Sequence, residues 1–266
     1  MPIHPTAVVD RSAEIDPTAE IGAYAVVEPY VRIGAHTRLW PHAYISEGTT
    51  LGESVQVHPY AVLGHIPQDL KWKPVPTYLT VGDGTIVREH VAVHRGTTPG
   101  STTVIGKRCF LICTAHVGHN CTIGDDAIIA GLVAGHVEFG PRVFVSGGVV
   151  VHQFVRIGEL AMIGGGARIG VDLPPFMTAI ERNRVTGPNV VGLRRAGLTS
   201  EERFELRQCY TLMYREGLTF PQAVERITAL VKTPAGQRLL AFLQAPSKRG
   251  FLAGARHGVK AAQIEE

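Results

Sequence analysis

The side chains of this chain that are best suited to acid–base chemistry are its histidines. The 266 residues include twelve of them, and several fall between residues 90 and 152. His119 and His136 are 17 positions apart, and His136 and His152 are 16 apart. Imidazole gains and loses its proton near neutral pH, so histidines held side by side can take a proton from a weak nucleophile. Taken singly, each is better explained as an ordinary surface histidine, and only a fold that aligns them would make a site.

A six-residue repeat predicts such an alignment. From Ile3 to Leu63 every sixth residue is Ile, Val or Leu, and four positions after each comes a small or β-branched residue such as Ala7. A period of six fits neither a helix nor a hairpin sheet, and it predicts a triangular coil of about 18 residues per turn. The aliphatic side chains should point into the prism. The glycine that often follows, as in Ile21-Gly22, should relieve the backbone at a corner.

The repeat is interrupted in three places. Residues 63–79 and 95–103 leave the pattern, and loops that leave a regular solenoid often line a site. After Ile129 the phase slips by two residues before it continues from Val133 to Ile169, so one coil should be two residues short. His119 and His136 are separated by nearly the length of one coil. Their side chains should therefore lie on the same edge of the prism.

Beyond Pro175 the six-residue period fades and helical signals replace it. Thr199 opens a capping box with Glu202, and Thr219 and Thr233 each precede a proline-containing helix start. We therefore expect two domains, a β-helix over residues 1–190 and a helical domain over residues 191–266.

Composition excludes several classes of protein. The formal net charge of +3 is too small to indicate a nucleic-acid partner, and no apolar run reaches the length of a membrane span. The N-terminus lacks the pattern of a signal peptide, so we expect a cytoplasmic protein. Cys109 and Cys121 fall on the small-residue position of the repeat, which predicts buried thiols rather than disulfides.

Seven short motifs occur in the order in which they occur in the UDP-N-acetylglucosamine O-acyltransferase family, whose members begin lipid A synthesis. They are Gln68-Asp69-Leu70-Lys71, His94-Arg95-Gly96, Ala115-His116-x-x-His119, Ala134-Gly135-His136, Val151-His152-Gln153-Phe154, Pro174-Pro175 and Asn189-x-x-Gly192-Leu193-x-Arg195. The chain resembles this family from residue 1 to about residue 250. The resemblance implies a mainly β fold, a left-handed parallel β-helix of hexapeptide repeats with a small α-helical C-terminal domain, assembled as a homotrimer.

The resemblance also implies an activity, the transfer of a 3-hydroxyacyl chain from acyl carrier protein to the 3-position of UDP-N-acetylglucosamine or a close UDP-amino sugar. His119 resembles the general base, and Gly135 the backbone donor to the thioester oxyanion, with His136 beside it. Residues that resemble substrate-positioning groups are Asp69, Lys71, His116 and His152. Residues that resemble contacts to the nucleotide, phosphate or pantetheine are His94, Gln153, Asn189 and Arg195. Gly165 resembles the position that limits acyl length. No metal or other cofactor is expected, because a thioester is already activated.

Three features depart from the family pattern. Asn120 stands where the family usually has Asp, Val191 where it commonly has Glu, and the coil between His119 and His136 is two residues short. They keep open a second hypothesis, a non-catalytic trimer that binds a sugar nucleotide or carrier protein. A third hypothesis is a metal-dependent hydratase, since carbonic anhydrases of the same fold hold zinc with histidines that bridge subunits.

Overall fold

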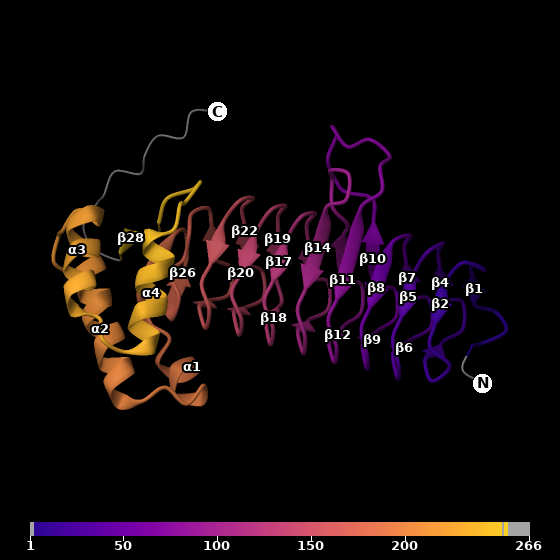
Figure 1. The fold of residues 1–266 in the computed structure, drawn as a ribbon, viewed down its shortest axis with the longest axis horizontal. Coiled ribbons are helices and arrows are strands. Elements are labelled where there is room, and N and C mark those ends of the chain that lie inside the picture. The colour runs from indigo at the N-terminus through magenta and orange to yellow at the C-terminus, as the bar shows by residue number, and fades with distance from the viewer. Residues whose placement is uncertain (1–2, 252, 255–266) are drawn as a thin grey trace.

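The computed structural model describes residues 3–251 and 253–254, and it shows stacked triangular coils that end against a group of helices (Figure 1). Short strands form three faces. From β1 (Val8–Val9) to β26 (Met177–Ile180) neighbouring strands of a face are parallel and consecutive strands along the chain belong to different faces, whereas β27 (Arg184–Pro188) pairs antiparallel with β26 on the same face. This arrangement confirms the β-helix that the six-residue repeat predicts.

The strands of each face stack in the order in which the chain reaches them. The first face contains β1 (Val8–Val9), β4 (Val26–Val27), β7 (Tyr44–Ile45), β10 (Val62–His65), β13 (Ala92–His94), β16 (His116–Val117), β19 (Leu132–Val133), β22 (Val150–Val151) and β25 (Arg168–Ile169). The second face contains β2 (Glu14–Ile15), β5 (Arg32–Ile33), β8 (Thr49–Leu51), β11 (Tyr78–Val81), β14 (Thr102–Ile105), β17 (Thr122–Ile123), β20 (Glu138–Phe139) and β23 (Arg156–Ile157). The third face contains β3 (Glu20–Ile21), β6 (Arg38–Leu39), β9 (Gln56–Val57), β12 (Ile86–Val87), β15 (Phe110–Leu111), β18 (Ile128–Ile129), β21 (Phe144–Val145), β24 (Met162–Ile163), β26 (Met177–Ile180), β27 (Arg184–Pro188) and β28 (Ala253–Gly254).

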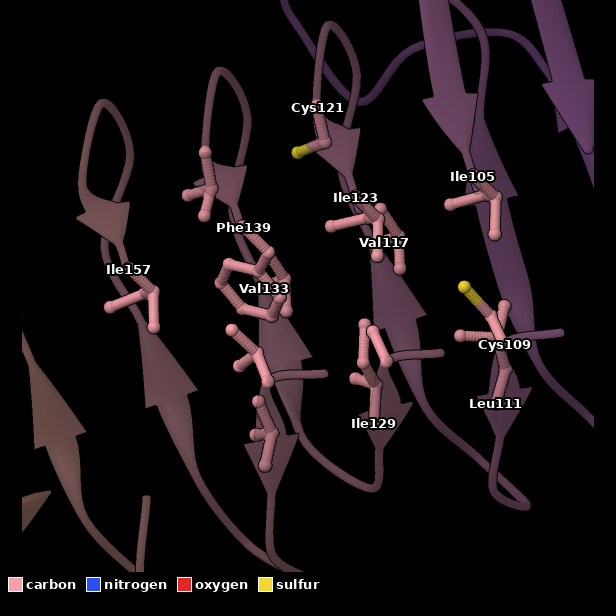
Figure 2. Packing of buried hydrophobic residues seen from close by; sticks show 14 of the residues in the cluster. Ile105, Cys109, Leu111, Val117, Cys121, Ile123, Ile129, Val133, Phe139 and Ile157 are labelled. Carbon is pink, nitrogen blue, oxygen red and sulfur yellow. The ribbon is translucent and has the colours of Figure 1, made fainter. Parts of the chain in front are cut away.

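Both repeat positions face the interior of the prism. Ile45, on the aliphatic position, and Ala43, on the small position, are each fully buried. Figure 2 shows the aliphatic side chains of successive coils pointing into the same interior, together with the thiols of Cys109 and Cys121. Burying one such Ile, Leu or Val side chain contributes about 1.5–3 kcal/mol, so the core that holds the coils together is aliphatic.

Corner glycines such as Gly84 and Gly148 relieve the backbone as expected, with φ of 66° and 71°, but Gly22 serves a different purpose. The φ of Gly22 lies outside the left-handed region, and the positive φ of that corner, 57°, belongs to Tyr24. A Cβ on Gly22 would lie 2.8 Å from the carbonyl oxygen of Leu39 in the next coil. Glycine is therefore required at this position by the close approach of two coils, and the expectation of backbone relief was wrong here.

One coil is shorter than its neighbours, as the phase slip predicts. His116 pairs with Leu132 in the parallel register, whereas Leu132 pairs with Val150. The shortening falls between β18 and β19, where only Ala130 and Gly131 connect the strands. The turn that follows β19 therefore keeps its full length, and the edge that carries the histidines is not interrupted.

The chain leaves the prism twice at the edge between the first and second faces, which we call the first edge. Residues 66–77 connect β10 to β11, and residues 95–101 connect β13 to β14. The longer excursion projects well away from the coils (Figure 1). The two excursions are joined where the Gly100 N–H donates to the Pro76 carbonyl at 2.8 Å.

The C-terminal part consists of α1 (Val190–Arg195), α2 (Ser200–Tyr214), α3 (Phe220–Leu230) and α4 (Pro234–Gln244). Thr199, Thr219 and Thr233 are the N-caps of α2, α3 and α4, as predicted, whereas the sequence did not predict α1 or the hairpin of β26 and β27. The expected second domain extends to residue 266, and its last twelve residues lie outside the described part. Within the described residues no helix is long and apolar enough to cross a membrane.

Candidate active site

The first edge brings the predicted catalytic residues together. Val117 pairs with Val133, so the turn that follows β16 lies directly beside the turn that follows β19. Because this coil is the short one, His119 stands level with Gly135, and Asn120 stands level with His136. The ring of His119 and that of His136 meet edge to face, with centroids 5.1 Å apart.

The imidazole of His119 lies directly against the backbone of Gly135. A Cβ on Gly135 would be 2.5 Å from Cε1 and 2.6 Å from Nε2 of His119, so only glycine leaves room for the ring. The other ring nitrogen, Nδ1, is 3.0 Å from Asn120 Oδ1. No acceptor within the described residues takes the Gly135 N–H. Nε2 of the half-buried His119 therefore lies beside the buried backbone of Gly135, whose N–H has no acceptor among the described residues.

An aromatic column continues from His136 toward the C-terminal segment. The ring of His136 stacks on Phe154 with centroids 4.6 Å apart, and Lys248 Nζ lies 5.1 Å from the centroid of Phe154. Burial lowers the pKa of His136, the neighbouring His119 and Lys248 lower it further, and Asp69 acts in the opposite direction. Lys248 is thus a charged residue of the site that the sequence motifs did not assign a role. Lys248 lies four residues beyond the end of α4 (Pro234–Gln244), in a segment whose sequence does not indicate a contact with the first edge.

We expect the variant Lys248→Met to raise the pKa of His136. The ammonium disfavours the imidazolium, so removing its charge makes protonation of His136 easier. The imidazole resonance of His136 should then titrate at higher pH in an NMR titration. An unmoved titration would show that Lys248 exerts no field on this ring. Lys232→Met, on a lysine outside the column, is the matched control.

His94 and His116 form a second pair on the first face. Their ring centroids are 5.2 Å apart, and the Nε2 atoms of both are buried without a hydrogen-bond partner among the described residues. His94 Nδ1 is 2.7 Å from the carbonyl oxygen of Ile66, so it is this nitrogen that carries the proton. Burial lowers the pKa of both imidazoles. Two neutral rings with unused Nε2 atoms are suited to hydrogen bonding with a bound substrate.

The remaining residues predicted beside the reacting centre lie on or near the first edge. Asp69 belongs to the longer excursion, where its Oδ1 accepts the Lys71 N–H at 2.9 Å, and Lys71 itself is exposed. His152 and Gln153 are exposed and directly precede Phe154 in the next turn of the edge.

Three predicted residues lie elsewhere. Gly165 is exposed at the edge between the third and first faces, in the turn that joins β24 to β25. Asn189 is buried as the N-cap of α1, where its Oδ1 accepts the Gly192 N–H and its Nδ2 donates to the Leu160 carbonyl. Arg195 is exposed at the end of α1. The contacts of Asn189 account for it as a capping residue, and a single chain does not bring these three to His119.

A metal centre is not formed by one chain in the part that the structure covers. No group of three or more His, Cys, Asp or Glu side chains there is arranged to hold a metal ion.

Comparison with known proteins relates the whole chain to one group of enzymes. A family model described as UDP N-acetylglucosamine O-acyltransferase, domain 2, matches residues 172–252. The chain is 44% identical over 259 residues to an acyl-(acyl-carrier-protein)–UDP-N-acetylglucosamine O-acyltransferase of Burkholderia lata, covering 94% of this chain and 98% of that protein. It is 49% identical over 233 residues to the protein of the same name from an Anaeromyxobacter species, covering 86% and 91%.

Solved structures extend the similarity to three dimensions. The UDP-N-acetylglucosamine O-acyltransferase of Moraxella catarrhalis superposes with a TM-score of 0.91 at 38% identity, covering 95% of this chain and all of that one. The UDP-N-acetylglucosamine acyltransferase of Francisella novicida superposes with a TM-score of 0.92 at 32% identity, covering 99% of each chain.

Proposed function

Because this chain belongs to the UDP-N-acetylglucosamine O-acyltransferase family and is an O-acyltransferase with a left-handed parallel β-helix fold, we propose that it transfers a 3-hydroxyacyl chain from acyl carrier protein to the 3-hydroxyl of UDP-N-acetylglucosamine. The product would enter lipid A biosynthesis, and the reaction would take place in the cytoplasm. The observation that carries the proposal is the contact of His119 with Gly135, which sets an imidazole nitrogen beside a free backbone N–H.

Each of the two groups has one task in the proposed reaction. His119 Nε2 takes the proton of the sugar hydroxyl as its oxygen bonds to the thioester carbon, and the Gly135 N–H donates to the carbonyl oxygen that becomes negative. When the tetrahedral intermediate collapses, the carbon–sulfur bond breaks and the proton on His119 passes to the leaving thiolate. The products are an ester and a free thiol, and no oxidant, metal or covalent enzyme intermediate is required.

We propose a homotrimer whose active sites lie between subunits. In one chain the first edge carries His119 and Gly135, whereas Gly165 lies on a different edge and Arg195 lies beyond the last coil. The flat faces beside the first edge also leave His119 half-buried rather than enclosed. A neighbouring prism packed along this edge would supply the missing wall of the site, and closed cyclic symmetry would repeat it three times.

A sedimentation experiment checks this assembly. The expected mass is three times the 28.7 kDa of one chain. A mass near 28.7 kDa at working enzyme concentration would contradict the proposed site between subunits.

Acyl transfer itself is tested by incubating the purified protein with 3-hydroxyacyl carrier proteins of graded length and UDP-N-acetylglucosamine. Mass spectrometry should detect an O-acylated sugar nucleotide. A parallel reaction with other UDP-amino sugars tests the close acceptor that the family resemblance also allows. Saturable binding of the sugar nucleotide without any acylated product would favour the non-catalytic trimer. The observation that supports this alternative is the neutral Asn120 at a position where the family usually has Asp.

We expect Gly165 to limit the length of the acyl chain. A Cβ at Gly165 would touch only the Gly147 carbonyl oxygen, at an ordinary 3.5 Å, so larger side chains fit without disturbing the coil. The series Gly165→Ala, Gly165→Val and Gly165→Met should shift the preference to progressively shorter chains. Each methylene denied burial costs about 0.8 kcal/mol, roughly fourfold in kcat/KM. Unchanged turnover of the shortest chain serves as the internal control, and a length profile that stays the same across the series would locate the limit elsewhere.

A further inference from the structure

The amide of Asn120 receives an unusual set of hydrogen bonds. Its Oδ1 accepts from the Thr97 N–H at 3.1 Å and from the Thr97 hydroxyl at 2.8 Å, and it lies 3.0 Å from His119 Nδ1. The backbone of Asn120 is held separately, because its N–H donates to Thr103 Oγ1 at 2.8 Å. We propose that Thr97 is a positioning residue of the transfer reaction, one that orients the Asn120 amide and thereby keeps Nε2 of His119 available as the proton acceptor.

The chemistry of the donors determines which end of the amide faces Thr97. The two ends of an asparagine amide are nearly the same size, so shape alone does not orient them. A backbone N–H can only donate, so the atom that meets the Thr97 N–H must be the amide oxygen. The same oxygen meets His119 Nδ1, which must therefore carry the hydrogen. In a neutral imidazole the other nitrogen, Nε2, then holds the lone pair. Nε2 is the nitrogen that lies against Gly135.

Orientation matters here because the residue is asparagine. A carboxylate presents an acceptor oxygen whichever way it turns, so it fixes the tautomer without help. A flipped asparagine would present its NH₂ group to Nδ1 of His119, the ring proton would move to Nε2, and the base would be lost. The N–H and the hydroxyl of Thr97 can both donate to the asparagine only when its Oδ1 faces them, which is the orientation that keeps Nε2 of His119 unprotonated. We infer that, with a neutral residue at position 120, full activity of this chain depends on the Thr97 hydroxyl.

Thr97 is itself held in place by the excursion that carries it. The Gly96 N–H donates to the Tyr78 carbonyl at 3.3 Å, and the Thr98 N–H donates to Ser101 Oγ at 3.0 Å. A Cβ on Gly96 would lie 2.5 Å from the Ser101 carbonyl oxygen, so the loop is packed closely on itself. Thr97 is half-buried, which shields its hydroxyl from competing water. The excursion of residues 95–101 thus holds the Thr97 hydroxyl in a fixed position at the first edge.

The test replaces the hydroxyl alone. Thr97→Val keeps the N–H and the branched shape, and we expect kcat to fall about threefold to tenfold, as for the loss of one hydrogen bond, with KM nearly unchanged. Thr97→Ser should restore kcat. Thr98→Val, at the exposed neighbouring threonine, should leave it at the wild-type value. In ¹⁵N NMR of the resting protein, the ring nitrogens of His119 should show protonated Nδ1 in the wild type and a mixture of tautomers in Thr97→Val.

A double-variant comparison separates positioning from mere support of the loop. In an Asn120→Asp background the tautomer no longer depends on Thr97, so Thr97→Val should cost little there. The carboxylate also stabilises the imidazolium, which should move the acidic limb of the pH–rate profile to higher pH.

An equal loss of kcat in both backgrounds would overturn the inference. So would an unchanged kcat together with an unchanged ¹⁵N pattern in Thr97→Val. The inference rests on the proposed function for its kinetics, but the ¹⁵N measurement needs no turnover. A chain that fails to acylate the sugar while showing protonated Nδ1 would thus count against the function and not against the orientation.

Discussion

Replacing His119 with alanine should lower kcat about 10²–10⁴-fold, the range typical for removal of a general base. The sugar hydroxyl would then have to lose its proton to water, while the backbone donor at Gly135 and the surrounding surface remain. Substrate affinity should change little, because the proton is transferred only in the transition state. Steady-state kinetics with saturating carrier-protein thioester, together with direct binding of the sugar nucleotide, measure the two quantities separately.

The matched control for this variant is another histidine away from the first edge. His36 is exposed in the turn after β5, on the edge between the second and third faces, so His36→Ala should retain wild-type kcat. Near-normal turnover by His119→Ala would assign the role of base to another imidazole. His136 is the first alternative because its ring meets that of His119, and His116 is the second.

Adding one methyl group at Gly135 should be nearly as damaging. The Cβ of Gly135→Ala would lie 2.5 Å from His119 Cε1, closer than non-bonded carbon atoms approach, so the ring must move. The movement would also stretch the 3.0 Å contact between His119 Nδ1 and Asn120. A displacement of about 1 Å at a reacting group can cost on the order of 10²-fold in rate, and we expect kcat to fall by about that factor.

A glycine with open space around it is the control for this substitution. Gly147 lies in the turn after β21, a Cβ there would meet nothing within 4 Å, and its φ lies outside the left-handed region. Gly147→Ala should therefore keep its melting temperature, and it should keep its kcat with the shortest acyl chain, which does not depend on the space beside Gly165. Gly135→Ala should keep its melting temperature while losing turnover, because the clash involves a side chain at the surface of the prism. Full turnover by Gly135→Ala would show that the ring has room that the structure does not give it.

The fold of this protein followed from local features of its sequence. The six-residue spacing of aliphatic residues such as Ile45 predicted the prism because each face repeats the same short strand and corner. Thr199 and Thr233 marked the starts of α2 and α4, because an N-cap hydrogen bond forms between residues only a few positions apart. The shared edge of His119 and His136 was predictable for the same reason, since one coil of nearly constant length separates them.

Tertiary structure alone decided which atoms meet at that edge. The phase slip after Ile129 located the short coil, but only the structure shows that the register of β16 with β19 sets His119 level with Gly135 and packs its ring against that backbone. Thr97 reaches Asn120 because the excursion of residues 95–101 folds back onto its own edge. Lys248 reaches Phe154 from beyond the last helix. These contacts depend on the paths of irregular segments. Long-range hydrogen bonds and packing set those paths, and the six-residue repeat does not predict them.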